Sequence, residues 1–386
     1  MSEIIKTKEY HKKTILQVVP ALVSGGVERG TIEIAGKLSR SDEFNSLVVS
    51  AGGPLVDKLD KLGIPHVELN VASKNPFTIW KNAKLIAGII RKYNVDLVHA
   101  RSRAPAWSCY MATKATGVKF ITTFHGIYNI SGFLKRYYNS IMTEGERIIA
   151  VSNFVKQHII SNYKTDEKKI RVIHRGIDQN YFDPASITPE HQLKFREKYN
   201  IPANTPVILL PSRMTAWKGH MSLIEALGLI KDQDFYCLMV GDLSKHPNFN
   251  KRVHAKIREL KLQSKIQIFG NEPDMLKLYG ICDIVLSTSI QPEAFGRTII
   301  EGQAMEKLVI ATSIGGAAET IKDKVTGFHV IPGNVQDLAE KISYCLSILG
   351  TEEAVKMGQE SRKSSIENFS LDLMLSKTLD VYRELI

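Results

Sequence analysis

Residues 284–305 read IVLSTSIQPEAFGRTIIEGQAM and join two kinds of pattern. The apolar run at the start, residues 284–286, is typical of a fully buried strand, whereas the segment from Arg297 onward has apolar residues at helical spacing. The loop between them, residues 291–296, ends in a glycine. A buried strand followed by a short loop and a helix is the repeating unit of a doubly wound parallel sheet. The stretch therefore predicts an α/β fold.

The same alternation of apolar runs and helical patterns extends outward in two blocks, which a turn-rich segment at residues 176–189 separates. We therefore predict two Rossmann-like doubly wound domains, residues 1–183 and 184–368. Residues 369–386 have apolar side chains at helical spacing, which predicts an amphipathic C-terminal helix. The predicted strands are 15–19, 46–49, 66–69, 96–99, 120–124 and 148–151 in the first block, and 207–210, 235–240, 266–269, 284–286 and 309–311 in the second. The predicted helices of the first block are 26–39, 54–62, 77–93 and 104–116.

The composition is that of a folded, basic protein. The chain has 386 residues and a net charge of +11, and such an excess of positive charge indicates an anionic partner. A phosphorylated metabolite, an acidic membrane surface and nucleic acid all fit that description. The 4 cysteines are far apart in the sequence and have neither metal-ligand nor redox-motif spacing, so we expect reduced thiols in a cytoplasmic protein.

The N-terminal segment imitates a short signal peptide, because several lysines precede the apolar run at residues 15–23. This run contains Gln17 and Pro20 and leads into a glycine loop without a small-residue cleavage pattern, so we interpret it as a strand. No window of about 18 apolar residues exists, and we therefore predict no membrane-spanning helix.

Two glutamates flank the loop and the helix of the opening stretch. Glu293 lies in the loop just before the N-terminus of the helix, and Glu301 lies just over one turn into the helix. Both carboxylates can therefore face one ligand from different positions along the helix axis. The free N–H groups of the first helical turn, around Arg297 to Ile299, point into the same space and favour a phosphate. Gly296 lets backbone amides approach a ligand closely. We expect this segment to hold a sugar, a ribose and a diphosphate.

A second cluster of charges follows the predicted strand 207–210. Arg213 and Lys218 lie at its carboxyl end, which is the ligand edge of a parallel sheet. Two fixed cations there neutralise a diphosphate leaving group and so replace a divalent metal. Asp232 and Asp234 form an Asp-x-Asp pair, but they precede a strand and so lie at the opposite edge. We therefore expect no metal ion and no other cofactor.

Two turns of the first block are further candidates. Gly25 and Gly26 close the predicted strand 15–19, but their spacing is not the dinucleotide fingerprint, and a turn beside a substrate phosphate or sugar fits better. His125 follows the strand 120–124 at its carboxyl end, where the imidazole of a histidine can hydrogen-bond a sugar hydroxyl. A purely structural histidine is the alternative.

These motifs, in this order along the chain, resemble the retaining glycosyltransferases of family 4, which have the GT-B fold. The likeness covers essentially the whole chain, and Glu293 with Glu301, following Arg213 and Lys218, is its most specific part. Residues 313–319, SIGGAAE, belong to it as well. The chain departs from the family at Ala294, where relatives often have Pro or Gly, and at residues 174–176, where they often have Asn-Gly.

The resemblance implies transfer of a sugar from a nucleotide-diphosphate donor to an acceptor hydroxyl, with retention at the anomeric carbon. It also implies that the two domains face each other across a cleft and that the C-terminal helix crosses back to the first domain. We expect same-face attack in which the leaving phosphate takes the acceptor proton. By similarity, the diphosphate is held by Arg213, Lys218 and the amides of Thr298 and Ile299, and the ribose by Glu301. By the same similarity, the donor sugar is held by Glu293 and the amides of Ala294, Phe295 and Gly296, and the base by Gly270 and Asn271. The resemblance also implies that His125 lies by the reacting centre and that Gly26 allows close approach to the phosphates.

The first domain is expected to bind the acceptor. Residues 132–138, GFLKRYY, mix aromatic and basic side chains, which suits an anionic lipid headgroup region. Arg101 and Arg103 add positive charge at the end of another strand. The acceptor is therefore predicted to be a glycan or glycolipid, such as a lipopolysaccharide core, at the inner face of the plasma membrane. A basic helix that faces water is the alternative.

Other function classes fit these residues less well. A nucleotide-sugar epimerase on the same scaffold needs acid and base groups at the reacting carbon and no acceptor site. A glycan phosphorylase needs a lysine placed for a pyridoxal cofactor, and none is evident. A non-enzymatic nucleic-acid-binding protein would explain the charge of +11. It leaves Glu293 and Glu301 without a role, however, and no nucleic-acid-binding motif is present.

Overall fold

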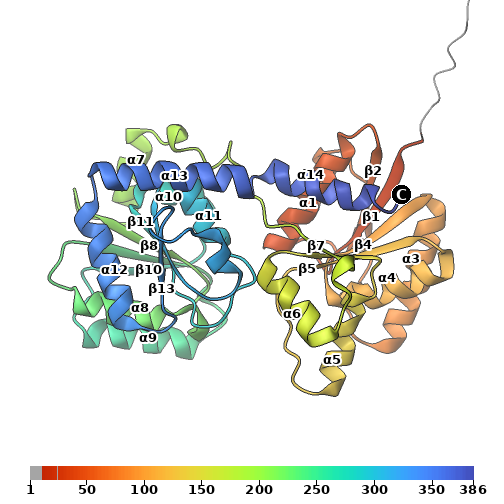
Figure 1. The fold of residues 1–386 in the computed structure, drawn as a ribbon, viewed down its shortest axis with the longest axis horizontal. Coiled ribbons are helices and arrows are strands. Elements are labelled where there is room, and N and C mark those ends of the chain that lie inside the picture. Colours follow the sequence, from red (N-terminus) through yellow and green to blue (C-terminus); the bar gives the residue numbers. More distant parts are fainter. Residues whose placement is uncertain (1–10, 24) are drawn as a thin grey trace, which may run out of the picture. The chain divides into compact units, whose positions relative to one another are not determined.

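Two parallel sheets organise the chain in the computed structural model, which describes residues 11–23 and 25–386 (Figure 1). Each sheet belongs to its own compact unit. Unit 1 comprises the chain up to Ile173 together with Leu375–Ile386, and unit 2 comprises His174–Met374. The predicted α/β class with two doubly wound domains is confirmed.

The sheet of unit 1 has the strand order β3-β2-β1-β4-β5-β6-β7, and every neighbouring pair is parallel. The order reverses at β1 and β4, which are neighbours although β2 and β3 separate them along the chain. At such a switch point the adjoining loops leave toward opposite faces and open a crevice at the carboxyl ends of the strands. The strands are β1 (Lys13–Val18), β2 (Phe44–Ser50), β3 (His66–Glu68), β4 (Val95–Ala100), β5 (Lys119–Phe124), β6 (Arg147–Ala150) and β7 (Ile170–Val172). The α-helices are α1 (Gly26–Ser39), α2 (Val56–Lys61), α3 (Pro76–Lys92), α4 (Arg103–Thr116), α5 (Phe133–Ser140) and α6 (Asn153–Tyr163).

The sheet of unit 2 repeats this topology with the order β10-β9-β8-β11-β12-β13, again all parallel. Its switch point lies between β8 and β11. The strands are β8 (Val207–Pro211), β9 (Tyr236–Val240), β10 (Ile266–Phe269), β11 (Ile284–Ser287), β12 (Leu308–Thr312) and β13 (Phe328–Val330). The α-helices are α7 (Pro189–Lys198), α8 (His220–Leu229), α9 (Pro247–Glu259), α10 (Met275–Ile281), α11 (Arg297–Ala304), α12 (Val335–Ile348) and α13 (Glu352–Phe369). None of the described helices is both long and apolar enough to cross a membrane.

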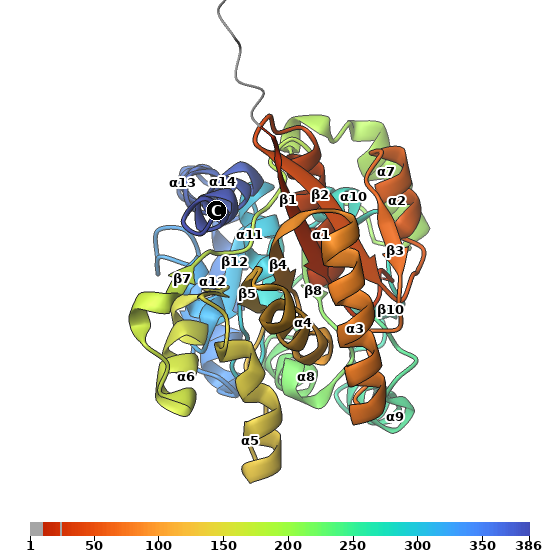
Figure 2. The same ribbon diagram turned by 90° about the vertical axis from the view of Figure 1, so that its right-hand side faces the viewer.

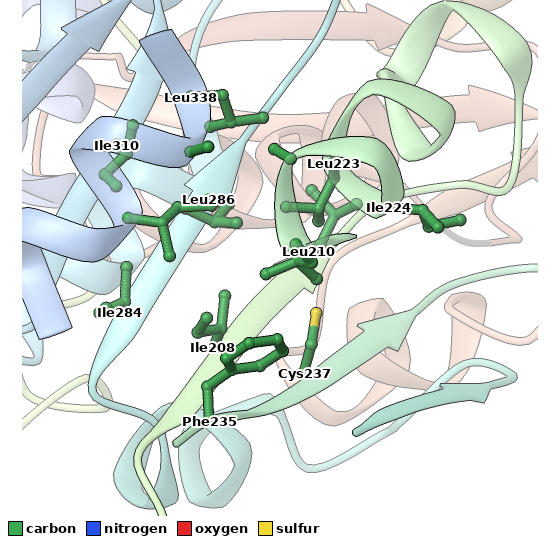
Figure 3. Packing of buried hydrophobic residues seen from close by; sticks show 14 of the residues in the cluster. Ile208, Leu210, Leu223, Ile224, Phe235, Cys237, Ile284, Leu286, Ile310 and Leu338 are labelled. Atoms are coloured by element: carbon green, nitrogen blue, oxygen red, sulfur yellow. The ribbon is translucent and has the colours of Figure 1, made fainter. Parts of the chain in front are cut away.

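The core of unit 2 fixes the two strands at its switch point. Both strands are apolar along their length because both faces of the sheet are covered. Ile208 and Leu210 of β8 and Leu286 of β11 belong to one buried cluster (Figure 3). Leu223 and Ile224 of α8 belong to the same cluster and are completely buried. The loops that follow β8 and β11 therefore start from a rigid base.

The C-terminal helix α14 (Leu371–Arg383) packs on unit 1 through its second half. Tyr382 is fully buried, and its hydroxyl lies 2.8 Å from Nδ1 of His99 on β4. Arg383 forms an ion pair of 2.7 Å with Glu43 at the start of β2. The end of the chain thus completes the unit that the beginning of the chain builds.

The predicted domain boundaries, after residues 183 and 368, differ from the limits of the units. Ile177 and Ser370 form an isolated parallel bridge. The amide of Ile177 donates to the carbonyl of Phe369 at 2.8 Å, and the amide of Leu371 donates back to Ile177 at 2.8 Å. Because these two distant segments hold each other inside unit 2, its limits lie at His174 and Met374.

Candidate active site

The loops that follow β8 and β11 meet at the switch point of unit 2. Gly219 has a φ of +76°, and a Cβ atom there would lie 1.8 Å from the carbonyl oxygen of Thr288. The Thr288 hydroxyl donates to the carbonyl of Lys218 at 2.9 Å, and the amide of Ile290 donates to the carbonyl of Trp217 at 2.8 Å. Only glycine permits this approach of the two backbones. As a result, the residues after β8 lie directly beside those after β11.

Lys218 and Glu293 meet where these loops touch. Lys218 Nζ lies 2.7 Å from Glu293 Oε2, and the two side chains are only 13% and 15% exposed. The other carboxylate oxygen of Glu293 accepts hydrogen bonds from the hydroxyls of Ser287, at 3.3 Å, and Ser289. The sequence predicted Lys218 and Glu293 as separate contacts to phosphate and sugar. The structure pairs the two side chains with each other, because the loops bring opposite charges together in a partly buried site.

The loop after β12 holds Glu293 through its backbone. Gly315 has a φ of +70°, and a Cβ atom at this residue would lie 2.6 Å from the carbonyl oxygen of Glu293. The amide of Gly316 donates to the same oxygen at 2.7 Å. A Cβ atom on Gly296 would come within 3.1 Å of Ala317. The residues SIGGAAE, which the sequence analysis included only through the resemblance, therefore shape the loop that carries Glu293.

Glu301 has a fixed orientation inside unit 2. The residue is 8% exposed, and its Oε2 accepts a hydrogen bond of 2.8 Å from the hydroxyl of Tyr279 on α10. Its Oε1 accepts a bond of 3.3 Å from Nε of Arg297, one helical turn earlier. Burial, followed by the charge of Glu301, raises the pKa of Tyr279 well above its usual value, so the phenol remains a donor. Sequence patterns do not single out Tyr279, because it lies in an apolar stretch typical of core residues.

The first turn of α11 uses one of the two amides that were predicted to bind phosphate. The amides of Ile299 and Ile300 both donate to the carbonyl of Gly296, at 3.1 and 3.2 Å. The amide of Thr298 donates to no backbone carbonyl among the described residues. The helix start therefore offers the N–H groups of Arg297 and Thr298 to a ligand, whereas that of Ile299 serves the helix itself.

Arg213 lies in the loop after β8, as predicted, and its side chain is exposed. Its guanidinium carbon is 5.9 Å from the centre of the Trp217 ring, and the Lys218 ammonium is 4.5 Å from the same ring. The two cations thus lie near one aromatic side chain. Gly270 and Asn271 are exposed after β10, at the same carboxyl edge of the sheet but outside the contacts of this cluster.

His174, at the departure from the family pattern, contacts the residues around the candidate site. Its ring is stacked on that of Phe295, with 5.6 Å between the centres, and stands edge-on to Phe369 at 5.3 Å. Its Nε2 lies 3.2 Å from Oε2 of Glu319. Phe295 lies in the loop that carries Glu293, and Glu319 lies in a short 3-10 helix whose first amide contacts the Glu293 carbonyl. The first residues of unit 2 therefore support the candidate site directly.

The candidates of the first block lie in unit 1, at the carboxyl edge of its own sheet. Gly25 has a φ of +130° and precedes Gly26, the first residue of α1. His125 directly follows β5 and is partly buried. No group of three or more metal-ligating side chains occurs in the part of the chain that the structure describes. Asp232 and Asp234 lie between α8 and β9, at the edge of the sheet away from the cluster, as predicted.

Comparisons with known proteins agree with this topology. The family model described as Glycosyltransferase Family 4 matches residues 24–181, and that described as Glycosyl transferases group 1 matches residues 191–364. A crystal structure of a glycosyltransferase from Rickettsia africae ESF-5 is 63% identical and covers 97% of this chain and 99% of that chain, with a TM-score of 0.92.

Two more distant proteins carry more specific descriptions. The Anabaena protein HepE, solved in complex with UDP and glucose, is 26% identical and covers 97% of this chain and 100% of that chain, with a TM-score of 0.83. The N,N'-diacetylbacillosaminyl-diphospho-undecaprenol alpha-1,3-N-acetylgalactosaminyltransferase of Campylobacter jejuni is 25% identical over 321 residues, which are 80% of this chain and 82% of that protein. The sequence motifs, the two switch-point sheets and these matches agree, and the chain belongs to the family 4 glycosyltransferases with the GT-B fold.

Proposed function

We propose that this glycosyltransferase moves a sugar from a nucleotide-diphosphate donor to an acceptor hydroxyl, with the donor bound at the switch point of unit 2. The observation that carries the proposal is the Lys218–Glu293 pair of 2.7 Å beside the start of α11. A cation, a carboxylate and free helix amides at one sheet edge suit the diphosphate and hydroxyls of a nucleotide sugar. HepE, which has the same fold, was solved with UDP and glucose.

The proposed chemistry follows from the charges in this cluster. The bond between the anomeric carbon and an oxygen of the β-phosphate breaks, and a bond from that carbon to the acceptor oxygen forms on the same face, so the configuration is retained. The leaving phosphate takes the acceptor proton. Lys218 and Arg213 stabilise the negative charge that develops on the β-phosphate, and each such donor typically lowers the barrier by about 3 kcal/mol. These two cations balance the negative charge of the diphosphate, for which other enzymes use a metal ion.

Donor binding would then rearrange the ion pair. Lys218 turns from Glu293 to the β-phosphate, while Glu293, still held by Ser287 and Ser289, accepts hydrogen bonds from the donor sugar. Glu301 keeps free lone pairs beside its bonds to Tyr279 and Arg297, because a carboxylate accepts about four hydrogen bonds. These lone pairs are suited to the ribose hydroxyls. His125 keeps its predicted role at the reacting centre as part of the proposal.

A thermal-stability screen tests donor binding. We expect one nucleotide among UDP, GDP and ADP, or its sugar conjugate, to raise the melting temperature. A ligand at 100 times its Kd adds about 2.7 kcal/mol of apparent stability. Glu301→Gln should reduce the gain, whereas Glu360→Gln, on an exposed part of α13, should leave it unchanged. If no nucleotide shifts the melting curve, the proposed donor site is wrong.

We propose further that the acceptor is a glycan or glycolipid at an anionic membrane surface, with lipopolysaccharide core as one candidate. Helix α5 extends away from the rest of unit 1 in both views (Figures 1 and 2). Phe133, Leu134 and Tyr137 on this helix are 81%, 79% and 59% exposed, and Lys135 and Arg136 lie beside them. Exposed apolar side chains next to basic ones suit insertion into an anionic headgroup layer. The Campylobacter relative is named for a lipid-linked acceptor.

Flotation with vesicles tests the membrane proposal. We expect the protein to float with vesicles that contain phosphatidylglycerol, and the double variant Phe133→Ser/Leu134→Ser to remain in the bottom fraction. Leu193→Ser/Val355→Ser serves as the matched control, because it removes two exposed apolar side chains from unit 2. Absence of flotation at low salt, or equal loss in both double variants, would show that α5 is a helix facing water.

A further inference from the structure

Arg101 lies at the switch point of unit 1, where a doubly wound sheet binds its ligands. It directly follows β4, and its amide donates to the carbonyl of Val18, the last residue of β1, at 2.9 Å. The residue is only 2% exposed. A positive charge is therefore held inside the fold at the carboxyl ends of the two central strands.

The guanidinium of Arg101 has few partners. Its Nη1 donates to Oε1 of Gln17 at 3.5 Å, and Gln17 in turn donates to the carbonyl of Thr31 on α1 at 3.1 Å. Its buried Nε has no hydrogen-bond partner among the described residues. No carboxylate in residues 11–23 or 25–386 forms an ion pair with it. Arg101 is thus a buried cation with most of its hydrogen-bonding capacity unused.

The groups around Arg101 do not cancel its charge. Burial lowers the pKa of Arg101 to about 10, so the guanidinium remains protonated at neutral pH. Nearby Tyr382, Glu33 and Glu28 raise this pKa, but they offset only part of the effect of burial. His99, two residues earlier on β4, is fully buried, and burial together with the charge of Arg101 lowers its pKa well below the usual value. His99 is therefore neutral, and its bonds to Tyr382 and Thr123 occupy both ring nitrogens.

A second arginine follows at the start of α4 and also has no carboxylate partner among the described residues. Arg103 Nη1 donates to Asn139 at 2.8 Å, and its guanidinium carbon lies 4.1 Å from the centre of the Tyr128 ring. These contacts fix the side chain without neutralising it. Residues 101 and 103 therefore form a basic pair on one strand-to-helix turn.

Buried charges in proteins are normally paired, because removing an ion from water without a counter-charge costs several kcal/mol. We propose that Arg101 is the counter-charge for an anionic group, a phosphate or a carboxylate, on the acceptor. The planar guanidinium binds either group through two parallel hydrogen bonds, and the unused Nε supplies one of them. This inference rests on the proposed transfer reaction and narrows its acceptor to an acidic sugar or a phosphorylated one.

The experiment uses the full chain saturated with the nucleotide found in the stability screen, so that the donor site is already filled. Inorganic phosphate, a hexose phosphate and a hexuronate are then added separately, and the melting temperature is followed. We expect at least one of them to stabilise the protein, and Arg101→Gln to weaken its apparent affinity by roughly 10- to 100-fold. The probe that acts distinguishes free phosphate, sugar phosphate and carboxylate as sources of the anion.

Two further variants keep the result interpretable. Arg101→Lys retains the charge but not the planar fork, so it should fold and bind with intermediate affinity. Arg91→Gln removes the same charge from an exposed position on α3 and should bind like the unchanged protein. Selenate soaked into crystals of the nucleotide complex should give anomalous density at the Arg101 guanidinium.

The outcomes separate the two proposals. If the nucleotide stabilises the protein but no anion does, or if Arg101→Gln keeps the anion effect, then Arg101 is a structural residue and the inference is overturned. Anomalous density for selenate only at other positions would likewise overturn the inference. Failure of every nucleotide, by contrast, would overturn the donor site, and the same anion series on the protein without nucleotide would then decide the anion site.

Discussion

Replacing Lys218 by alanine is expected to lower kcat by about 10²- to 10³-fold, the usual effect of removing one donor that stabilises transition-state charge. The Lys218 ammonium lies 2.7 Å from Glu293, and the Lys218 side chain is only 13% exposed, so its charge is poorly screened by water. The measurement is the rate of sugar transfer, or of donor hydrolysis, with the nucleotide sugar found in the stability screen. Lys356→Ala, on the exposed side of α13, is the matched control.

A second variant separates catalysis from support of the fold. Lys218→Ala leaves Glu293 without its counter-charge in a partly buried site, which destabilises unit 2 as well. In Lys218→Met/Glu293→Gln both charges are absent, so we expect stability close to that of the unchanged protein and no recovery of activity. An increase in KM with unchanged kcat would instead show that Lys218 binds the donor equally well before and during the reaction.

Replacing Gly219 by alanine is expected to lower the free energy of unfolding of unit 2 by about 3 kcal/mol or more. The new Cβ atom would meet the Thr288 carbonyl at 1.8 Å, so the loops after β8 and β11 must separate. Their separation also moves Lys218 away from Glu293, and activity should fall even where the protein stays folded. Urea unfolding followed by circular dichroism measures the first effect, and the transfer assay measures the second.

Gly350→Ala is the control for this prediction. Gly350 has a similar φ of +79°, but a Cβ atom there has no neighbour within 4 Å. Its replacement therefore adds only the cost of a left-handed backbone, about 1 kcal/mol. Equal losses in Gly219→Ala and Gly350→Ala would mean that the loop contact at Thr288 contributes nothing.

The sequence predicts several elements of the architecture at or near their observed bounds. The strand predicted at 266–269 has the observed bounds of β10, and the helix predicted at 26–39 has those of α1. Strands β7 and β13 escaped prediction; each has three residues and so few positions for a period to appear, although β3, which is equally short, was predicted. Both lie at the edges of their sheets, so their omission did not change the fold class.

The candidate site was predictable in its charges but not in its pairings. Arg213, Lys218 and Glu293 follow recognisable strands, and in a parallel sheet this places them at one edge. That Lys218 binds Glu293 depends on how closely two loops approach, which Gly219 decides through a backbone contact. The support of Glu301 by Tyr279 depends on a side-chain hydrogen bond between two separate helices, α10 and α11. Such contacts between distant segments leave no trace in local sequence patterns.

The contact between His99 and Tyr382 has a consequence for synthesis on the ribosome. All of unit 2 is translated between the strands of unit 1 and the helix that completes it. At about 5–20 residues per second, β4 waits on the order of ten seconds or more for its last neighbour. Unit 2 is contiguous and can finish folding first, so a ribosome that stalls before α14 is made would hold a chain whose earliest part is the unfinished one.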